Sequence, residues 1–421
     1  MEAGANFCHK CGQAVTPYSF TPVHPQYPPY QPVKDTTIRD LGMGIGTYAT
    51  IALLVLMAVN VLIAIWGIGQ VYPHMDRHIY LFIITPYIVN FAELGGWPFF
   101  IYYVLLVAAI GASLVWAVVK SAKPLVSELK IDYPAQGHSP VYVIGTVLMA
   151  IVSFNVVYYL IVGVVGIDPT TPSFSTRELW QTLFGFAHAS VWEEVASRIL
   201  LIGVPLLLID LVRRTKNPDL KMRKVSNYLL GGGFAIGKKE AFLMVFSSLM
   251  FGAAHIFSWD LYKILPAAVA GLAFAYLFLK LGVYASILMH FGIDFMSVPL
   301  SVFPDNYEIT MLLGLAILVW VGVGLLYMLL YASKGLGWIL GRRIWPDIPW
   351  ERPLPTAPMP QHYPPYYPQG VGYGQPPAPI PPPQQVPRDP TAIGYVCKSC
   401  GNREATYVDG ELTCLKCGNR G

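Results

Sequence analysis

The sequence is poor in charge. Aspartate, glutamate, lysine and arginine make up only 12% of its 421 residues, about half of the share that is usual in soluble proteins. Hydrophobic residues make up 54%, and they are gathered in runs long enough to cross a bilayer, which needs about 20 apolar residues for each crossing. This composition excludes an ordinary soluble domain. Inside a bilayer the backbone has no water to bind, so these runs are predicted to be helical.

The sequence also lacks a strong charge bias and a recognisable leader. Its formal net charge is only +4, which gives little reason to expect nucleic-acid binding. The first apolar run begins near Met43, behind a polar stretch, so we expect no cleavable signal peptide in front of it. Cysteine is absent from the apolar body, because all six cysteines lie outside it in three C-x-x-C pairs. In a reducing compartment such pairs bind metal more often than they form disulfides.

Two linkers rich in proline and tyrosine divide the sequence into parts. Segments of this composition cannot bury a core and act as spacers. We predict a cysteine-bearing head, a linker, a membrane body, a second linker and a compact tail, over residues 1–16, 17–40, 41–340, 341–394 and 395–421. In the body, hydropathy predicts about eight transmembrane helices, near 43–69, 97–119, 141–166, 180–211, 241–258, 262–280, 283–300 and 310–333. The apolar run 79–91 is short and broken by Pro86, so we predict an interfacial or re-entrant segment there.

Lysine and arginine are spread unevenly over the loops. Eight of them lie between positions 213 and 239, whereas the loops 168–176 and 304–308 have none. An even number of spans with both termini inside puts the basic loops in the cytoplasm, as the positive-inside rule requires. Only isolated charges, Arg77 and Lys263, fall on the other side. We therefore expect a multi-pass protein of the cell membrane, surrounded by lipid, with both termini cytoplasmic.

Ionisable residues lie inside three of the predicted spans, where such residues are costly and point to function. They are Glu193, Glu194, Arg198, His255, His290 and Asp294. Glu194 and Arg198 are four residues apart, so they share a helix face and can neutralise each other. Glu193 then points about 100° away around the helix. His290 and Asp294 also share a face by the same spacing. The pattern predicts that a free carboxylate, two imidazoles and a further carboxyl meet between three helices.

The ordered motifs E-E-x-x-x-R, F-x-x-x-H and H-x-x-x-N/D resemble the CAAX protease and bacteriocin-processing family, also called the Abi family. This family includes the eukaryotic type II CAAX prenyl endopeptidase, and the resemblance covers about 177–300. It implies an intramembrane endopeptidase that cleaves a membrane-associated or lipid-modified protein or peptide with a glutamate-activated water, and no cofactor in the catalytic site. By this resemblance Glu193 is the general base and His255 assists with the water. His290 and Asp294 match the pair that stabilises the oxyanion, and Glu194 matches the partner of Arg198 in a structural ion pair.

One position departs from the family pattern, because the endopeptidases carry asparagine where this sequence has Asp294. An ionised aspartate would repel an oxyanion, so Asp294 is expected either to be neutral or to orient His290. Other interpretations stay open. The residues could form a non-catalytic cavity in a membrane scaffold or immunity-type protein, or a polar network that holds the helices together. They could also bind zinc, although there is no H-E-x-x-H motif.

The tail predicts a zinc ribbon. Its ligands would be Cys397, Cys400, Cys414 and Cys417, spaced C-x2-C-x13-C-x2-C around a D-G turn. Four thiolates form the closed tetrahedral site of a structural zinc ion, whose binding supplies the folding energy of so small a module. Together with the spans, this predicts an all-α polytopic membrane protein with a small β zinc ribbon at its C-terminus.

The head carries only half of such a ribbon, with the single pair Cys8 and Cys11 as its predicted metal ligands. We expect an upstream start codon to supply the missing half. The alternatives are that another chain completes the site or that the pair binds nothing. Because the tail is not strongly basic, the ribbons are expected to bind a cytoplasmic protein rather than nucleic acid.

Overall fold

The structure is a computed structural model of the 421-residue chain. It describes residues 38–84, 88–129, 139–169, 177–218, 221–257, 259–341, 344, 405–408 and 411–414. The head and most of both linkers lie outside these residues, so the predictions made for them stay predictions. The chain divides into two units, Met1–Ala357 and Pro358–Gly421.

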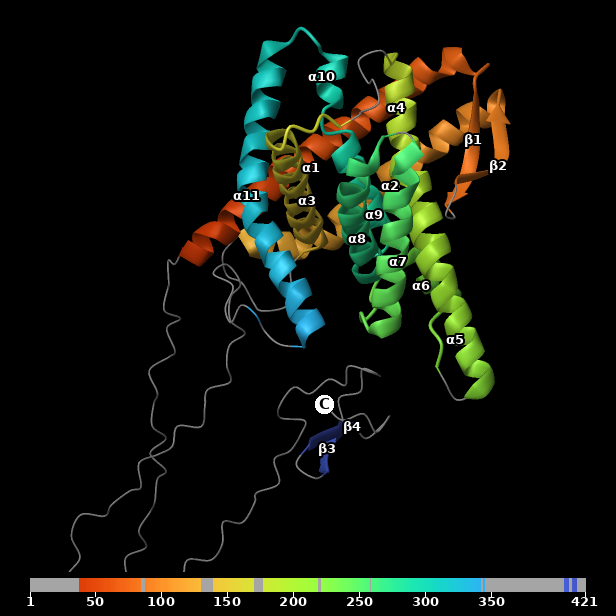
Figure 1. Ribbon diagram of the computed structural model, residues 1–421, viewed down its shortest axis with the longest axis vertical. Coiled ribbons are helices and arrows are strands. Elements are labelled where there is room, and N and C mark those ends of the chain that lie inside the picture. The colour runs from red at the N-terminus through yellow and green to blue at the C-terminus, as the bar shows by residue number, and fades with distance from the viewer. Residues whose placement is uncertain are drawn as a thin grey trace, which may run out of the picture. The chain divides into compact units, whose positions relative to one another are not determined.

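The first unit is mostly helical (Figure 1). Its longer elements are α1 (Ile38–Val71), β1 (His78–Ile84), β2 (Ile88–Gly95), α2 (Trp97–Leu129), α3 (Pro140–Val164), α4 (Leu179–His188), α5 (Val204–Lys216), α6 (Val225–Leu230), α7 (Lys238–Ala254), α8 (Ile264–Lys280), α9 (Val283–Asp294), α10 (Val298–Val302) and α11 (Tyr307–Leu340). Shorter turns are η1 (Tyr72–His74), η4 (His255–Phe257) and η5 (Leu261–Lys263). Between α4 and α5 lie two π-helical segments, η2 (Ala189–Glu193) and η3 (Val195–Gly203).

Within the described residues, six helical segments are long and apolar enough to cross a membrane. They are Ile45–His74, Trp97–Val126, Pro140–Val164, Leu179–Lys216, Leu261–Lys280 and Tyr307–Leu340, and each overlaps a predicted span. The other two predicted spans, 241–258 and 283–300, overlap the shorter helices α7 and α9. Because α7 ends at Ala254 and α9 ends at Asp294, the count of about eight transmembrane helices stays a prediction.

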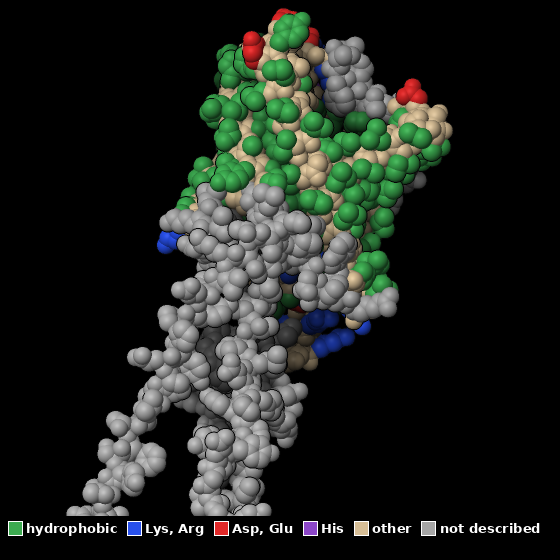
Figure 2. All heavy atoms as spheres, turned by 90° about the vertical axis from the view of Figure 1, so that its left-hand side faces the viewer, with side chains coloured by type: hydrophobic (Ala, Val, Ile, Leu, Met, Phe, Trp, Pro, Cys, Tyr) green, Lys and Arg blue, Asp and Glu red, His purple; other side chains and the backbone are tan. Residues whose placement is uncertain are grey.

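The surface of the helices is apolar, as a bilayer requires. On the face shown in Figure 2, hydrophobic side chains cover the described elements between acidic side chains at one end and lysine and arginine at the other. Leu312 and Leu315 on α11 are exposed by 71% and 60%, although leucine is normally buried in a soluble protein. An apolar surface of this extent marks contact with lipid or protein. The unit is the body of an integral membrane protein.

The body is not purely helical, which corrects the all-α prediction. Residues His78–Ile84 and Ile88–Gly95 form an antiparallel hairpin, with a register shift between Leu81 and Phe82. The sequence of the first strand, HIYLFII, is rich in the β-branched and aromatic residues that favour strands. The chain leaves and re-enters the bundle at the same end (Figure 1). That this segment is interfacial or re-entrant stays a prediction.

Close helix contacts bring together the elements that hold the candidate site. A Cβ atom at Gly252 would lie 2.7 Å from the carbonyl oxygen of Ile264, so only glycine lets α7 pack this closely on α8. On the other side of the bundle, a Cβ at Gly324 of α11 would lie 2.1 Å from the carbonyl oxygen of Met149 in α3. Small residues at such crossings are typical of membrane helices, whose association depends on close packing.

In the second unit the structure describes one hairpin. Strands β3 (Ala405–Val408) and β4 (Glu411–Cys414) pair antiparallel, with Ala405 opposite Cys414. In the described ranges, no group of three or more histidine, cysteine, aspartate or glutamate side chains is arranged to hold a metal ion. The six cysteines are outside that search, because none has a described side chain. The zinc sites of the head and the tail therefore stay predictions.

Candidate active site

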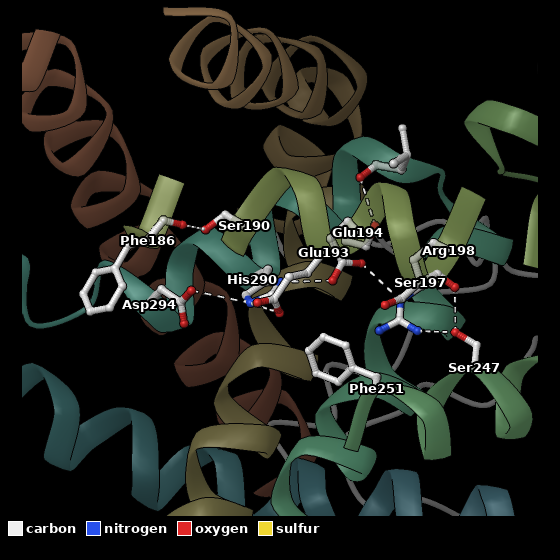
Figure 3. Close-up of polar contacts among 12 residues, drawn as sticks. Phe186, Ser190, Glu193, Glu194, Ser197, Arg198, Ser247, Phe251, His290 and Asp294 are labelled. Carbon is white, nitrogen blue, oxygen red and sulfur yellow. Dashed lines mark hydrogen bonds and ion pairs between the residues drawn. The ribbon is translucent and has the colours of Figure 1, made fainter. Parts of the chain in front are cut away.

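The two neighbouring glutamates lie in a π-helical stretch of the chain. Glu193 ends η2 and Glu194 directly precedes η3, in the middle of the long apolar segment Leu179–Lys216. The spacing of the residues predicts an ordinary α-helix here, so this stretch does not follow from the sequence. π-Helical turns are rare and occur frequently at functional sites. Both carboxylates point toward the same histidine, His290 (Figure 3).

Glu194 and Arg198 form an ion pair that is completely buried. Arg198 Nε donates to Glu194 Oε2 at 3.2 Å, and neither side chain has any exposed surface. Arg198 Nη1 also donates to the hydroxyl of Ser247 on α7 at 2.6 Å, and the guanidinium carbon lies 5.2 Å from the centre of the Phe251 ring. Removing one member of a buried pair leaves an uncompensated charge. The pair therefore ties η3 to α7, at the position where the sequence predicted it.

His290 contacts three carboxylates at once. Its Nδ1 lies 3.0 Å from Glu194 Oε1, while its Nε2 lies 3.9 Å from Glu193 Oε2 and 3.5 Å from Asp294 Oδ2. The imidazole also stacks on the ring of Phe274 in α8, with 4.7 Å between the ring centres. A carboxylate can only accept from Nδ1–H, so Glu194 fixes the orientation of the ring and leaves Nε2 facing the other two acids.

Exposure separates these side chains into two sets. The side chains of Glu193 and Asp294 are 20% and 23% exposed. In contrast, Glu194 and Arg198 are 0% exposed and His290 is 7% exposed. Water-sized contact is therefore available to Glu193 and Asp294, whereas the ion pair behind them is closed off.

His255 lies near the site but does not contact the other predicted catalytic residues directly. It is the first residue of η4, just beyond the end of α7, rather than inside a helix as predicted. Its Nδ1 lies 2.8 Å from the carbonyl oxygen of Phe251. Because a carbonyl only accepts, Nδ1 carries the proton and the lone pair is on Nε2. In the described part of the chain, no hydrogen bond or ion pair joins His255 to Glu193, His290 or Asp294.

Sequence reasoning missed Lys263, which it treated as an isolated loop charge. Lys263 ends η5, where its ammonium nitrogen lies 4.0 Å from the centre of the Trp259 ring. Among the described residues it forms no ion pair with Asp294 or Glu193, and its charge interacts with both only at longer range. A hint was present in the sequence, because this lysine directly precedes an apolar run on the side where positive charge is scarce.

A comparison with known protein families found a match in this part of the chain. Residues 175–296 match the family of Rce1-like type II CAAX prenyl endopeptidases. The matched range includes the six ionisable residues that the sequence predicts for the site, and it is close to the range 177–300 expected from the motifs. No curated protein and no solved structure matches the chain. The membrane body therefore carries a CAAX prenyl endopeptidase-like protease domain, which is a hydrolase.

Proposed function

We propose that the chain is an intramembrane endopeptidase that hydrolyses a peptide bond of a membrane-associated or lipid-modified protein or peptide, with a water molecule activated by Glu193. The observation that carries the proposal is the pair of accessible carboxylates, Glu193 and Asp294, at the Nε2 edge of a buried imidazole that Glu194 holds from behind. The match of residues 175–296 to the endopeptidase family supports it.

In the proposed reaction, Glu193 takes a proton from the water as the water oxygen attacks the carbonyl carbon of the substrate. A tetrahedral intermediate with an oxyanion forms. Glu193 then delivers the proton to the amide nitrogen, the C–N bond breaks, and a carboxylic acid and an amine leave. A general base must come within about 3 Å of the proton it removes, and the exposed part of Glu193 leaves room for a water molecule there.

The imidazole of His290 is the proposed donor to the oxyanion. With both ring nitrogens protonated, Nδ1–H donates to Glu194 and Nε2–H is directed into the site. A fixed donor at an oxyanion contributes on the order of 3 kcal/mol to catalysis. Asp294 Oδ2 lies 3.5 Å from Nε2, which supports the view that Asp294 orients and balances the imidazole rather than binding the oxyanion itself.

His255 is proposed to hold the attacking water. Its Nδ1 is engaged with the carbonyl of Phe251, so Nε2 is left to accept a hydrogen bond from water. Such a contact needs no direct bond to Glu193, since a water molecule can bridge two polar groups. We further propose that both termini are cytoplasmic and that the tail cysteines bind structural zinc. The hairpin β3–β4 between the two tail C-x-x-C pairs supports a ribbon.

Comparative mass spectrometry of protein termini tests the proposed function. Cells carrying the wild-type protein are compared with cells carrying Glu193→Gln at matched expression. Glu308→Gln serves as control, because Glu308 is an exposed carboxylate in the first turn of α11. We expect new termini with the wild type and with Glu308→Gln, and none with Glu193→Gln. Identical profiles for all three, with folded protein in the membrane, would support the non-catalytic scaffold instead.

A further inference from the structure

The hairpin β1–β2 lies beside the proposed general base. Trp192, which directly precedes Glu193, donates from its indole nitrogen to the carbonyl oxygen of Phe82 on β1 at 2.9 Å. Ile84, the last residue of β1, is only 4% exposed and belongs to the same buried cluster as Ala196 of η3. β1 also contacts η3 and α7, whereas β2 lies against α2 (Figure 1). The strand therefore lies against the helical segments of the site, in contact with the residue that precedes Glu193.

The main chain of this hairpin is paired on one side only. The two strands bond each other from His78 opposite Gly95 to Ile84 opposite Ile88. Across the described residues, no main-chain hydrogen bond joins either strand to a third segment. Open sheet edges are avoided in hydrocarbon, because unpaired amides find no water there. An open edge is also a ready template for another strand.

We infer that the edge of β1 at Phe82–Ile84 is the docking strand for the substrate, which adds to it as an extended peptide segment and places its scissile bond at Glu193. This inference rests on the proposed function and says how the substrate of that site is held. A helical substrate would keep its amides bonded internally, so cleavage requires an extended segment. Strand addition supplies main-chain hydrogen bonds whatever the substrate sequence, and the alternation of side chains then sets which of them face the site.

In the free enzyme, the indole of Trp192 takes the hydrogen-bonding position on β1 that the substrate main chain would occupy. Its indole N–H occupies the carbonyl of Phe82, which is the acceptor that an added strand would use through its own amide. Docking exchanges one hydrogen bond for another of the same kind. Because Trp192 and Glu193 are neighbours in the chain, the exchange takes place directly beside the base. A second copy of the chain could also cover this edge, but it would bring no scissile bond to Glu193.

A scan of N-methylated peptides tests the docking strand on the wild-type protein. The probe is a synthetic peptide that spans a cleavage site identified by terminus profiling. Its unmodified form must first be cut by the wild type and spared by Glu193→Gln, which tests the proposed function separately. N-methylation at successive backbone positions removes one amide donor at a time. We expect KM to rise about tenfold at every second position and to change little in between, since the amides of a strand alternate in direction. Cleavage without this alternation would contradict the inference of a docking strand, but it would not contradict the proposed protease function.

Trp192→Phe gives a second, independent measurement. The substitution removes the indole donor and keeps an aromatic ring. If the only role of Trp192 is to occupy the carbonyl of Phe82 in the free enzyme, the substitution makes this carbonyl available to the substrate. KM is then expected to fall on the order of threefold, the scale of one net hydrogen bond. Phe303→Leu, at an exposed residue beyond α10, is the matched aromatic control and is expected to leave KM unchanged. A lower kcat with an unchanged or higher KM in Trp192→Phe would mean that the indole only braces the helix, and would contradict the inference.

Discussion

The carboxylate of Glu194 holds the imidazole of His290. Its Oε1 lies 3.0 Å from His290 Nδ1, and its Oε2 lies 3.2 Å from Arg198 Nε. A single buried side chain therefore connects the cation on η3 to the histidine on α9. The sequence predicted only the contact with Arg198, because that contact is four residues away. The contact with His290 bridges 96 residues and depends on how α9 packs against the π-helical stretch.

Loss of charge at the two neighbouring glutamates is expected to affect different properties. At Glu194 it lowers the stability of the fold, and at Glu193 it abolishes cleavage. Glu194→Gln leaves Arg198 buried without a counter-ion, and we expect it to destabilise the fold by about 3 kcal/mol or more. Glu193→Gln, at the partly exposed carboxylate, should abolish cleavage with a change in stability below about 1 kcal/mol. Thermal unfolding in detergent and terminus profiling measure the two effects. Equal melting temperatures for both variants would contradict the assignment of Glu194 as the structural carboxylate.

Asp294→Asn tests how far the departure from the family pattern matters. The amide oxygen of asparagine can lie near His290 Nε2 as the carboxylate oxygen does at 3.5 Å, so we expect kcat to stay within about threefold of the wild type. Asp294→Ala removes the acceptor 3.5 Å from Nε2 and should lower kcat by about tenfold or more. Peptide cleavage with purified protein gives both numbers. A dead Asn variant beside an active Ala variant would show that Asp294 does not orient the imidazole.

The membrane helices and the order of the site residues could be predicted because both are local properties. Run length predicts a helix in hydrocarbon, and a four-residue spacing predicts the pair Glu194–Arg198. The hairpin at residues 78–95 was not predicted as strands, since a short apolar run broken by a proline does not distinguish a strand from a helix. Its contact with the site, between Phe82 and Trp192, bridges 110 residues and follows only from tertiary packing.

The positions of His255 and Lys263 also could not be predicted from the sequence, because they depend on where single helices end. The sequence predicted His255 inside a helix, but α7 ends one residue earlier and a 3₁₀ turn begins there. Lys263 ends the next turn, η5, where its charge interacts at longer range with Asp294 and Glu193. Element ends are the least reliable part of a sequence-based prediction, and here they decide which charges reach the site.

The tail is expected to bind zinc without taking part in cleavage. Native mass spectrometry of the full chain should show one zinc ion lost in Cys400→Ser, because three thiolates do not complete a closed structural site. Cleavage of the peptide probe should be unchanged in this variant. Ser333→Ala removes a hydroxyl that donates to the carbonyl oxygen of Leu330 within α11, and this variant should keep the metal. Unchanged zinc content in Cys400→Ser would refute the predicted ribbon.

Lys263 is expected to act as a positioning residue for the two accessible acids. Its ammonium is held against the ring of Trp259 and interacts with Asp294 and Glu193, so it offsets part of the negative charge that gathers at the site. Lys263→Met keeps the length of the side chain and removes the charge, and we expect kcat/KM to fall about tenfold, the scale of one charged contact. Lys263→Arg keeps the charge and should retain most of the wild-type kcat/KM. A purely structural role would not predict this, since the larger guanidinium packs differently in the same space. If Met and Arg were equally impaired, shape rather than charge would be what the site requires at this position.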